Sequence, residues 1–400
     1  MSKFRNNIML AKSLLANRQM IRVSPAINLF LARYMGKFKL MNVDGQLILH
    51  SHLPPVNSLA FTRFIDEQLL ARTPGPSHAQ IALTDECPQQ CLYCYNKNRK
   101  GQRMTTAEIK RTIADLRDSG VIWLGLTGGE PLLNPDIVEI IASAGSSCAI
   151  KLFTTGFGLT RELALALQKA GLFSACVSLD HWQVDVHDQI RGYPGAYRIA
   201  LEAIEIFRQT PGIHTSVSTV VSREMIHDGQ LAVFIEFLRD LGIHEVWLSE
   251  AKPTVADFQK EELVITESER LELVRLQDRF NRQGKLTINY LGHFEGSEHF
   301  GCNAGNKMVY VDAFGEVSPC VFLPMTFGNI REKPMQDLLS DMRSQFASQG
   351  GCFINKHYAL VGKYRQSPAP ISRAETLALM KEVQAGPPAT FSRLYYKHKG

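Results

Sequence analysis

Between residues 78 and 290, short runs rich in β-branched and aromatic residues alternate with helical stretches, and this alternation constrains the fold more than any other feature of the chain. The runs begin roughly 30 to 40 residues apart, which is the length of one β-α unit. Six such units in a row predict a parallel α/β fold, either a barrel or an open sheet. The six runs span residues 79–84, 121–126, 149–153, 175–179, 214–220 and 244–248.

Helix start signals lie between the runs. Thr105 with Glu108, and Thr266 with Glu269, form capping-box patterns. In this pattern the threonine oxygen accepts from a free backbone N–H, and the glutamate reaches back to the cap. The dipeptide 134–135, Asn-Pro, predicts a third helix start, with the asparagine as N-cap and proline at the first helical position.

Unusual segments follow four of the six runs. The sequence CPQQCLYCY, residues 87–95, follows the first run, and TGGEP, residues 127–131, follows the second. Residues 154–156 follow the third run, and Asp180 ends the fourth. In parallel α/β folds the loops after the strands gather at one edge, where the chemistry takes place. The order of the segments therefore predicts one site built from separate loops.

The first of these loops holds Cys87, Cys91 and Cys94. A four-iron cluster bound by three thiolates keeps one iron open for another ligand, whereas a closed structural zinc site has four protein ligands. A zinc site with a distant fourth ligand, or a cluster with a distant fourth cysteine, are the alternatives. Disulfides are not expected, because eight cysteines in 400 residues do not resemble a short secreted framework.

Together these motifs resemble the radical S-adenosylmethionine (SAM) superfamily, and the resemblance covers more than half of the chain. It rests on Cys-x-x-x-Cys-x-aromatic-Cys at 87–94, Gly-Gly-Glu-Pro at 128–131, and the six-unit α/β region. The resemblance implies a partial (β/α)6 TIM-like barrel over residues 78–290 that binds a 4Fe–4S cluster and SAM. The residues implied are Cys87, Cys91 and Cys94 for the cluster, and Tyr93, Gly128, Gly129, Glu130, Pro131, Ser178, Asp180 and Arg191 for SAM.

The resemblance also implies how these residues act. SAM would chelate the open iron through its amino and carboxylate groups. Gly128 and Gly129 would expose backbone to the amino group, because glycine permits close approach, and Glu130 would accept from it. Tyr93 would lie along the adenine.

The fourth run adds two further implied contacts and one departure. Ser178 and Asp180 resemble the motif that contacts the SAM ribose and carboxylate, and Arg191 resembles the arginine that pairs with the carboxylate. His181 and Trp182 stand where relatives often have glycine. They either shape the substrate pocket or pack in the core, and we expect packing.

A second set of three cysteines, Cys302, Cys320 and Cys352, lies after residue 290. It resembles the C-terminal SPASM and "twitch" extensions of radical SAM enzymes, truncated here, which carry auxiliary 4Fe–4S clusters. One auxiliary 4Fe–4S cluster is the most that three cysteines predict. The fourth ligand of this cluster is either a side chain such as His357 or His299, or the substrate, which would bind the open iron as in the molybdopterin-precursor cyclase family. The alternative is that the three cysteines bind zinc or no metal.

Four segments follow from these patterns: a basic N-terminal extension (1–77), the core barrel (78–290), the auxiliary-cluster region (291–365) and a C-terminal tail (366–400). The function implied is that of an oxidoreductase which cleaves SAM reductively to a 5′-deoxyadenosyl radical and abstracts hydrogen from an unactivated carbon. The auxiliary cluster would assist oxidation, cyclisation or C–C and C–S bond formation. The implied electron donor is of the ferredoxin or flavodoxin type.

The organic substrate is left open between a peptide, a small molecule and an amphiphile. A methyltransferase-type radical SAM enzyme is a near rival, and a non-catalytic zinc or Fe–S binding protein is a remote one. No nucleic-acid partner is expected.

Positive charge is concentrated at the N-terminus. Residues 1–43 carry eight basic residues and no acid, which leaves the rest of the chain at a net charge of −3. Such an arm suits an anionic partner, so a peripheral membrane contact through residues 1–43 is one expectation, and a solvated helical extension is the alternative. There is no transmembrane-length apolar run and no secretory signal pattern, so the expected location is the cytoplasm, with membrane association through the basic arm as the second expectation.

Overall fold

The computed structural model describes residues 15–97, 99–254, 260–284, 286–346, 350–365 and 370–396. The first fourteen residues, which carry Lys3, Arg5 and Lys12 of the basic arm, lie outside the described residues. In the part of the chain that is described, no helix is both long and apolar enough to cross a membrane.

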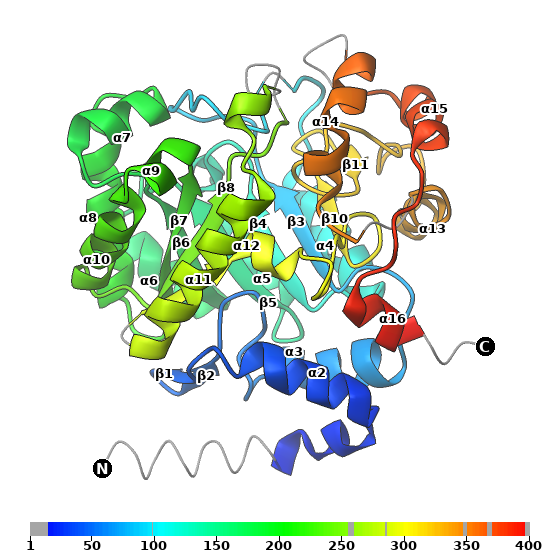
Figure 1. The fold of residues 1–400 in the computed structure, drawn as a ribbon, viewed down its shortest axis with the longest axis horizontal. Helices are drawn as coiled ribbons and strands as arrows, with labels where there is room; N and C mark the ends of the chain where they lie inside the picture. Colours follow the sequence, from blue (N-terminus) through cyan, green and yellow to red (C-terminus); the bar gives the residue numbers. More distant parts are fainter. Residues whose placement is uncertain are drawn as a thin grey trace.

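A nine-stranded sheet forms the centre of the molecule (Figure 1), and its strand order is β11-β10-β3-β4-β5-β6-β7-β8-β9. Neighbouring strands are parallel except for β10 and β11, which are antiparallel. The six expected runs are β3 to β8, so the α/β prediction is confirmed. The strands are β3 (His78–Ala82), β4 (Trp123–Thr127), β5 (Ala149–Thr154), β6 (Leu172–Ser178), β7 (His214–Val221), β8 (Glu245–Glu250), β9 (Thr287–Tyr290), β10 (Met308–Val311) and β11 (Val317–Ser318).

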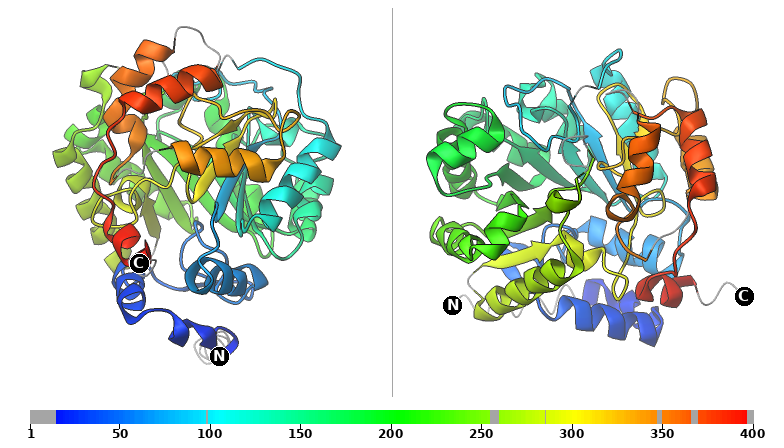
Figure 2. Two further views of the ribbon diagram at one scale, coloured as in Figure 1. Left: turned by 90° about the vertical axis from the view of Figure 1, so that its right-hand side faces the viewer. Right: turned by 45° about the horizontal axis from the view of Figure 1, so that its top comes forward.

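Helices cover the outer face of this sheet (Figures 1 and 2), because the outward-facing strand residues are apolar and are buried against them. Both capping boxes are confirmed, at Thr105 and Thr266. The helices are α4 (Thr106–Asp118), α5 (Ile137–Ala144), α6 (Arg161–Ala170), α7 (Val184–Arg191), α8 (Ala196–Gln209), α9 (Arg223–His227), α10 (Gln230–Asp240) and α11 (Glu267–Gln283), with short 3₁₀ turns η3 (Pro131–Leu133) and η5 (Glu261–Leu263).

The helix start predicted at Asn134 is wrong. Helix α5 begins at Ile137, with Asp136 at its N-cap. The Asn134 amide instead donates from Nδ2 to the Leu83 carbonyl at 3.0 Å, while its Oδ1 accepts from the Asp136 N–H at 2.9 Å. A long-range bond to the end of β3 thus uses the side chain that the local pattern assigned to a cap.

The inner face of the sheet is aromatic. Trp123 and Trp247 stack with ring centroids 6.4 Å apart, and the edge of Phe153 meets Trp247 at 5.6 Å. Lys151 is fully buried there, with its Nζ 3.8 Å from the Trp247 ring centroid. These side chains fill part of the barrel interior, and two of them, Phe153 and Trp247, also line the cavity described below.

The N-terminal segment closes the end of the barrel where the strands begin (Figure 1). Ser51 enters the interior: its N–H donates to Glu245 Oε2 at 2.7 Å, and its carbonyl accepts from Trp123 Nε1 at 2.9 Å. From residue 15 onward, the basic extension is therefore part of the packed fold. Its elements are η1 (Arg18–Arg22), α2 (Pro25–Met35), β1 (Met41–Val43), β2 (Gln46–Ile48), α3 (Leu59–Arg63) and the π-helix η2 (Phe64–Leu70).

The C-terminal region continues the same sheet, since β10 pairs with β3. Its last helix packs on the N-terminal segment (Figure 2), where Phe30 lies 5.2 Å from Phe300 and 5.3 Å from Phe391 between ring centroids. Helices α2 and α16 (Thr390–Tyr396) thus stabilise each other. The remaining helices are α12 (Leu291–Phe294), α13 (Met335–Gln345), α14 (Phe353–Tyr364) and α15 (Arg373–Glu382).

Candidate functional site

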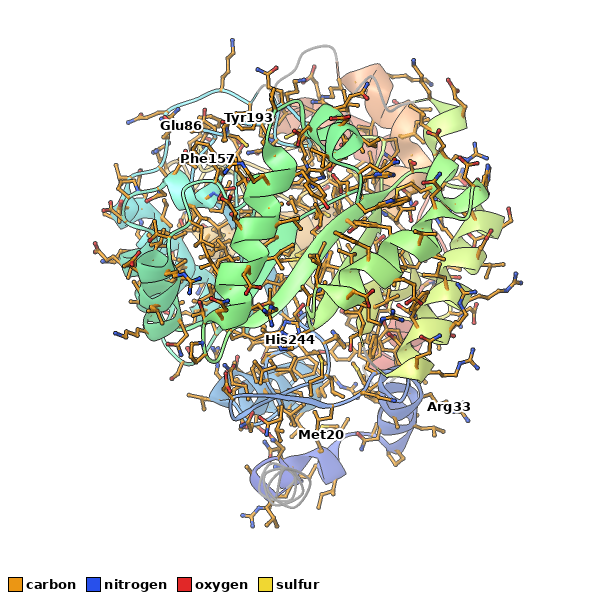
Figure 3. The ribbon with its side chains drawn as sticks, turned by 90° about the vertical axis from the view of Figure 1, so that its left-hand side faces the viewer. Met20, Arg33, Glu86, Phe157, Tyr193 and His244 are labelled. Carbon is orange, nitrogen blue, oxygen red and sulfur yellow. The ribbon has the colours of Figure 1, made fainter. Side chains whose placement is uncertain are left out.

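The loops after the strands gather at one end of the molecule, as predicted. Figure 3 places Glu86, Phe157 and Tyr193 together at this end, while His244, which precedes β8, lies toward the opposite end with Arg33. Strands that run in parallel bring their carboxyl ends to one edge. The loops after β3, β4, β5 and β6 therefore become neighbours.

The loop after β3 carries Cys87, Cys91 and Cys94, which are free thiols and all line one cavity. The loop is held by backbone bonds to the end of α7: the Gln90 N–H donates to the Arg191 carbonyl at 2.9 Å. Burial raises the pKa of Cys87 to about 12 and also raises that of Cys94. Metal binding would therefore have to displace protons from these thiols.

Gly128 and Gly129 let the loop after β4 cross the cysteine loop at backbone contact. A Cβ on Gly128 would lie 2.3 Å from the Thr84 carbonyl oxygen, and one on Gly129 would lie 2.0 Å from the Glu86 carbonyl oxygen. The Gly129 N–H donates to the Thr84 carbonyl at 2.7 Å. The close approach for which glycine is needed is thus between two loops of the protein, and both glycines also line the cavity.

Glu130 is fully buried and lies behind the cavity wall, as does Pro131. Its Oε1 accepts from the Leu132 N–H at 3.0 Å and from Thr154 Oγ1 at 2.6 Å, and its Oε2 accepts from the Thr155 N–H at 2.6 Å and the Thr155 hydroxyl. These four donors fill the acceptor capacity of a carboxylate. Glu130 therefore ties the loops after β4 and β5 together.

Asp180 connects Tyr93 and Arg191. Its Oδ2 accepts from the Tyr93 hydroxyl and pairs with Arg191 Nη2 at 2.8 Å, and its Oδ1 accepts from the Val220 N–H at 2.9 Å. Asp180 lies behind the wall, whereas Tyr93, Arg191 and Ser178 line the cavity. The arrangement lets one buried carboxylate orient two groups that face the cavity.

Arg191 points toward the cysteine loop, with its Nη1 3.7 Å from Cys91 Sγ. It is nearly buried, and within the described parts of the chain its Nε has no hydrogen-bond partner. An unpaired buried donor beside free thiols suits an anionic group, so the residues present fit a cluster with a carboxylate ligand such as SAM.

His181 and Trp182 pack rather than line the cavity, as expected. Their rings stack 4.1 Å apart, and Trp182 lies 6.0 Å from the Phe234 ring.

The second cysteine set opens onto the same cavity. Cys302, Cys320 and Cys352 are free thiols in three separate segments, and all three line it. Lys252, buried just after β8, donates from Nζ to Cys352 Sγ at 3.3 Å. The donor set, three free thiols beside a buried ammonium, fits an iron–sulfur cluster.

The cavity has a volume of about 490 Å³ and extends from the first cysteine set to the second. One end is apolar and lies between the N-terminal segment and the C-terminal helix. The side chains that line this end include Leu31, Tyr34, Met35, Phe64, Leu69, Phe294, Phe300, Phe391 and Tyr395.

Among the polar residues of the cavity that were missed from the sequence are Glu250, Lys252 and Glu295. Glu250 and Lys252 stand at the carboxyl end of the sixth run, the position that predicted the other loops. Their position after a strand was the sequence signal that could have identified them as site residues. No such signal marked Glu295, because it follows a four-residue helix in a glycine-rich region and not a predicted strand.

Two family models match the chain. Residues 81–238 match the radical SAM superfamily, and residues 302–360 match SPASM, an iron–sulfur cluster-binding domain. The AdoMet-dependent heme synthase of Methanosarcina barkeri is 27% identical over 296 residues, which cover 68% of this chain and 84% of that protein. The PqqA peptide cyclase of Bradyrhizobium diazoefficiens is 28% identical over 234 residues, which cover 54% of this chain and 58% of that protein.

Among solved structures, Streptococcus suis SuiB bound to its precursor peptide SuiA aligns with a TM-score of 0.57 and 16% identity. The alignment covers 80% of this chain and 78% of that one. At this identity the likeness concerns the fold alone.

Proposed function

Because the chain belongs to the radical SAM superfamily and carries a C-terminal SPASM-type iron–sulfur domain, we propose that this radical SAM enzyme oxidises or cross-links an organic substrate held between two clusters. When bound, the 4Fe–4S cluster and SAM supply a 5′-deoxyadenosyl radical that removes hydrogen from an unactivated carbon. The proposal is carried by one observation: both cysteine sets open onto a single cavity of about 490 Å³.

We assign the residues as follows. Cys87, Cys91 and Cys94 hold the first cluster, and Cys302, Cys320 and Cys352 hold the second. The residues that meet SAM are those on the cavity wall: Tyr93, the backbone of Gly128 and Gly129, Ser178 and Arg191.

Glu130 and Asp180 receive positioning roles in place of direct contact with SAM, because their carboxylates already accept from the protein's own groups. Pro131, behind the wall, is a structural part of the same loop. For SAM to reach Glu130, one of its four donors would have to be released.

A peptide is the substrate that we propose first. The relatives named PqqA peptide cyclases support it. The apolar end of the cavity would receive an apolar or aromatic side chain, because burying such a group there removes it from water. A low-potential donor of the ferredoxin or flavodoxin type would supply the electron.

An amphiphile is the second candidate, and it is favoured by the surface of the N-terminal segment. Leu15, Ile21 and Leu29 are 71%, 85% and 52% exposed beside Arg18 and Arg22. Apolar side chains next to basic ones suit an anionic lipid surface. In co-sedimentation with anionic vesicles, the intact chain should bind more tightly than a variant with all basic residues of 1–43 neutralised; equal binding would remove this candidate's support.

The proposed reaction is tested by anaerobic reconstitution followed by dithionite and SAM. Formation of 5′-deoxyadenosine, lost in Cys91→Ala, is the expected result. S-adenosylhomocysteine without 5′-deoxyadenosine would point instead to methyl transfer. Incubation with candidate peptides, with product mass measured, would then separate peptide from amphiphile substrates.

A further inference from the structure

Cys302, Cys320 and Cys352 leave one coordination position open. Three thiolates satisfy three irons of a four-iron cluster. All three thiols line one cavity. The question is which group of this chain faces the fourth iron.

Neither histidine expected from the sequence reaches the cavity. The His299 ring lies 4.2 Å from the His293 ring and 5.4 Å from Tyr34, which places it toward the N-terminal helix α2. The His357 ring packs on Phe353 at 4.7 Å within α14. Neither ring lines the cavity onto which the three thiols open.

Glu295 does line that cavity. Lys252 Nζ donates to Glu295 Oε2 at 2.8 Å and to Cys352 Sγ at 3.3 Å, so one buried ammonium holds the carboxylate beside a proposed cluster ligand. The carboxylate and the three thiols thus line the same cavity, and one buried ammonium connects the carboxylate to Cys352.

We propose that Glu295 is the fourth protein ligand of the auxiliary cluster and that Lys252 positions its carboxylate, an inference that rests on the auxiliary cluster of the proposed function. Carboxylate oxygen is an established ligand of protein-bound iron. Lys252 holds Oε2, and among the described residues no hydrogen bond to Oε1 is found, which leaves Oε1 for the iron. Burial of Lys252 also places a positive charge beside an anionic cluster.

The test uses the full chain with Cys87, Cys91 and Cys94 changed to alanine, so that only the auxiliary cluster is present. Anaerobically reconstituted parent, Glu295→Gln, Glu295→Cys and the control Glu298→Gln are compared by iron content, electron paramagnetic resonance and midpoint potential. Glu298 is a matched control, because it is an exposed acid three residues further along.

The parent should hold about four irons per chain. Glu295→Gln should fall toward about three on mild oxidation, with the signal of a three-iron cluster. Glu295→Cys should keep about four irons and lower the midpoint potential, since a non-thiolate ligand raises it. Glu298→Gln should match the parent.

A Glu295→Gln variant with the parent's spectrum and midpoint potential would overturn the assignment. The fourth iron would then be bound by substrate or solvent and not by Glu295. If Glu295→Gln does not fold by circular dichroism, Glu295→Cys decides: recovered fold and iron with a shifted potential support ligation, and an unshifted potential overturns it. A parent that binds no iron would instead refute the auxiliary cluster, and with it this part of the proposed function.

Discussion

A buried ion pair joins the cysteine loop to the C-terminal region, and breaking it should destabilise the protein strongly. Arg99 Nη1 lies 2.9 Å from Asp312 Oδ2, and the two side chains are only 3% and 1% exposed. Asp312 Oδ1 also accepts from the N–H groups of Phe314 and Glu316, at 2.9 and 3.0 Å. The carboxylate thus organises the turn after β10 while it neutralises Arg99.

Asp312→Asn keeps the side-chain size but leaves the Arg99 guanidinium buried without a counter-charge. Loss of one partner from a buried pair costs about 3–5 kcal/mol, so we expect the free energy of unfolding to fall by about this amount. Glu202→Gln is the control, because its partner Arg198 is 72% exposed and Glu202 is 58% exposed. Such exposed helical pairs contribute about 0.3–0.5 kcal/mol.

Urea unfolding, followed by the fluorescence of the three tryptophans, measures both variants. The double variant Arg99→Met/Asp312→Asn should recover most of the loss, because it removes the unpaired guanidinium while the asparagine Oδ1 can still accept from the N–H groups of Phe314 and Glu316. If Asp312→Asn costs no more than Glu202→Gln, the pair is not neutralised as the structure indicates and the reasoning fails.

Three further predictions concern the loops and the clusters. Gly129→Ala would place a Cβ 2.0 Å from the Glu86 carbonyl oxygen, so we expect the loops after β3 and β4 to separate. Formation of 5′-deoxyadenosine should then fall at least about tenfold, which corresponds to a loss of about 1.4 kcal/mol in transition-state stabilisation. Normal activity would contradict this prediction. The hydrogen bond from Arg331 lowers the pKa of Glu108 to about 2. The ionised Glu108 therefore stabilises the fold at pH values above 4.5, the ordinary pKa of a glutamate, and this stabilisation is lost as the pH falls toward about 2. Glu108→Gln should flatten the acid side of the stability–pH curve, and an unchanged curve would argue against this role. Cys302→Ala should lower the iron content from about eight to about four per chain, and an unchanged count would speak against a second cluster.

Much of the site could be read from the chain because its motifs are local. The order of strand, loop and helix between residues 78 and 290 placed Cys87, Cys91 and Cys94 after one strand and Gly128–Pro131 after the next. Parallel strands then bring these loops together whatever the details of packing. This topology is why the fold class and the position of the first cysteine set were both predictable.

Side-chain roles within the loops were less predictable. The sequence predicts Asp180 and Glu130 as ligand contacts. In the structure, however, Glu130 accepts from Thr154 and Thr155, 24 and 25 residues away, and Asp180 accepts from Val220, 40 residues away. A one-dimensional pattern shows where a carboxylate stands, but not which buried donors already satisfy it.

By itself, the sequence determined the parallel α/β core, the two sets of three cysteines and the loop that carries each motif. These depend on periodicity and spacing, which act over a few residues. Only the tertiary structure decided that the second set shares a cavity with the first, that Lys252 and Glu295 stand beside it, and that the N-terminal segment closes the barrel. These are contacts between residues 40 or more positions apart, and they arise from the burial of apolar surface and the pairing of buried charges, which no local pattern encodes.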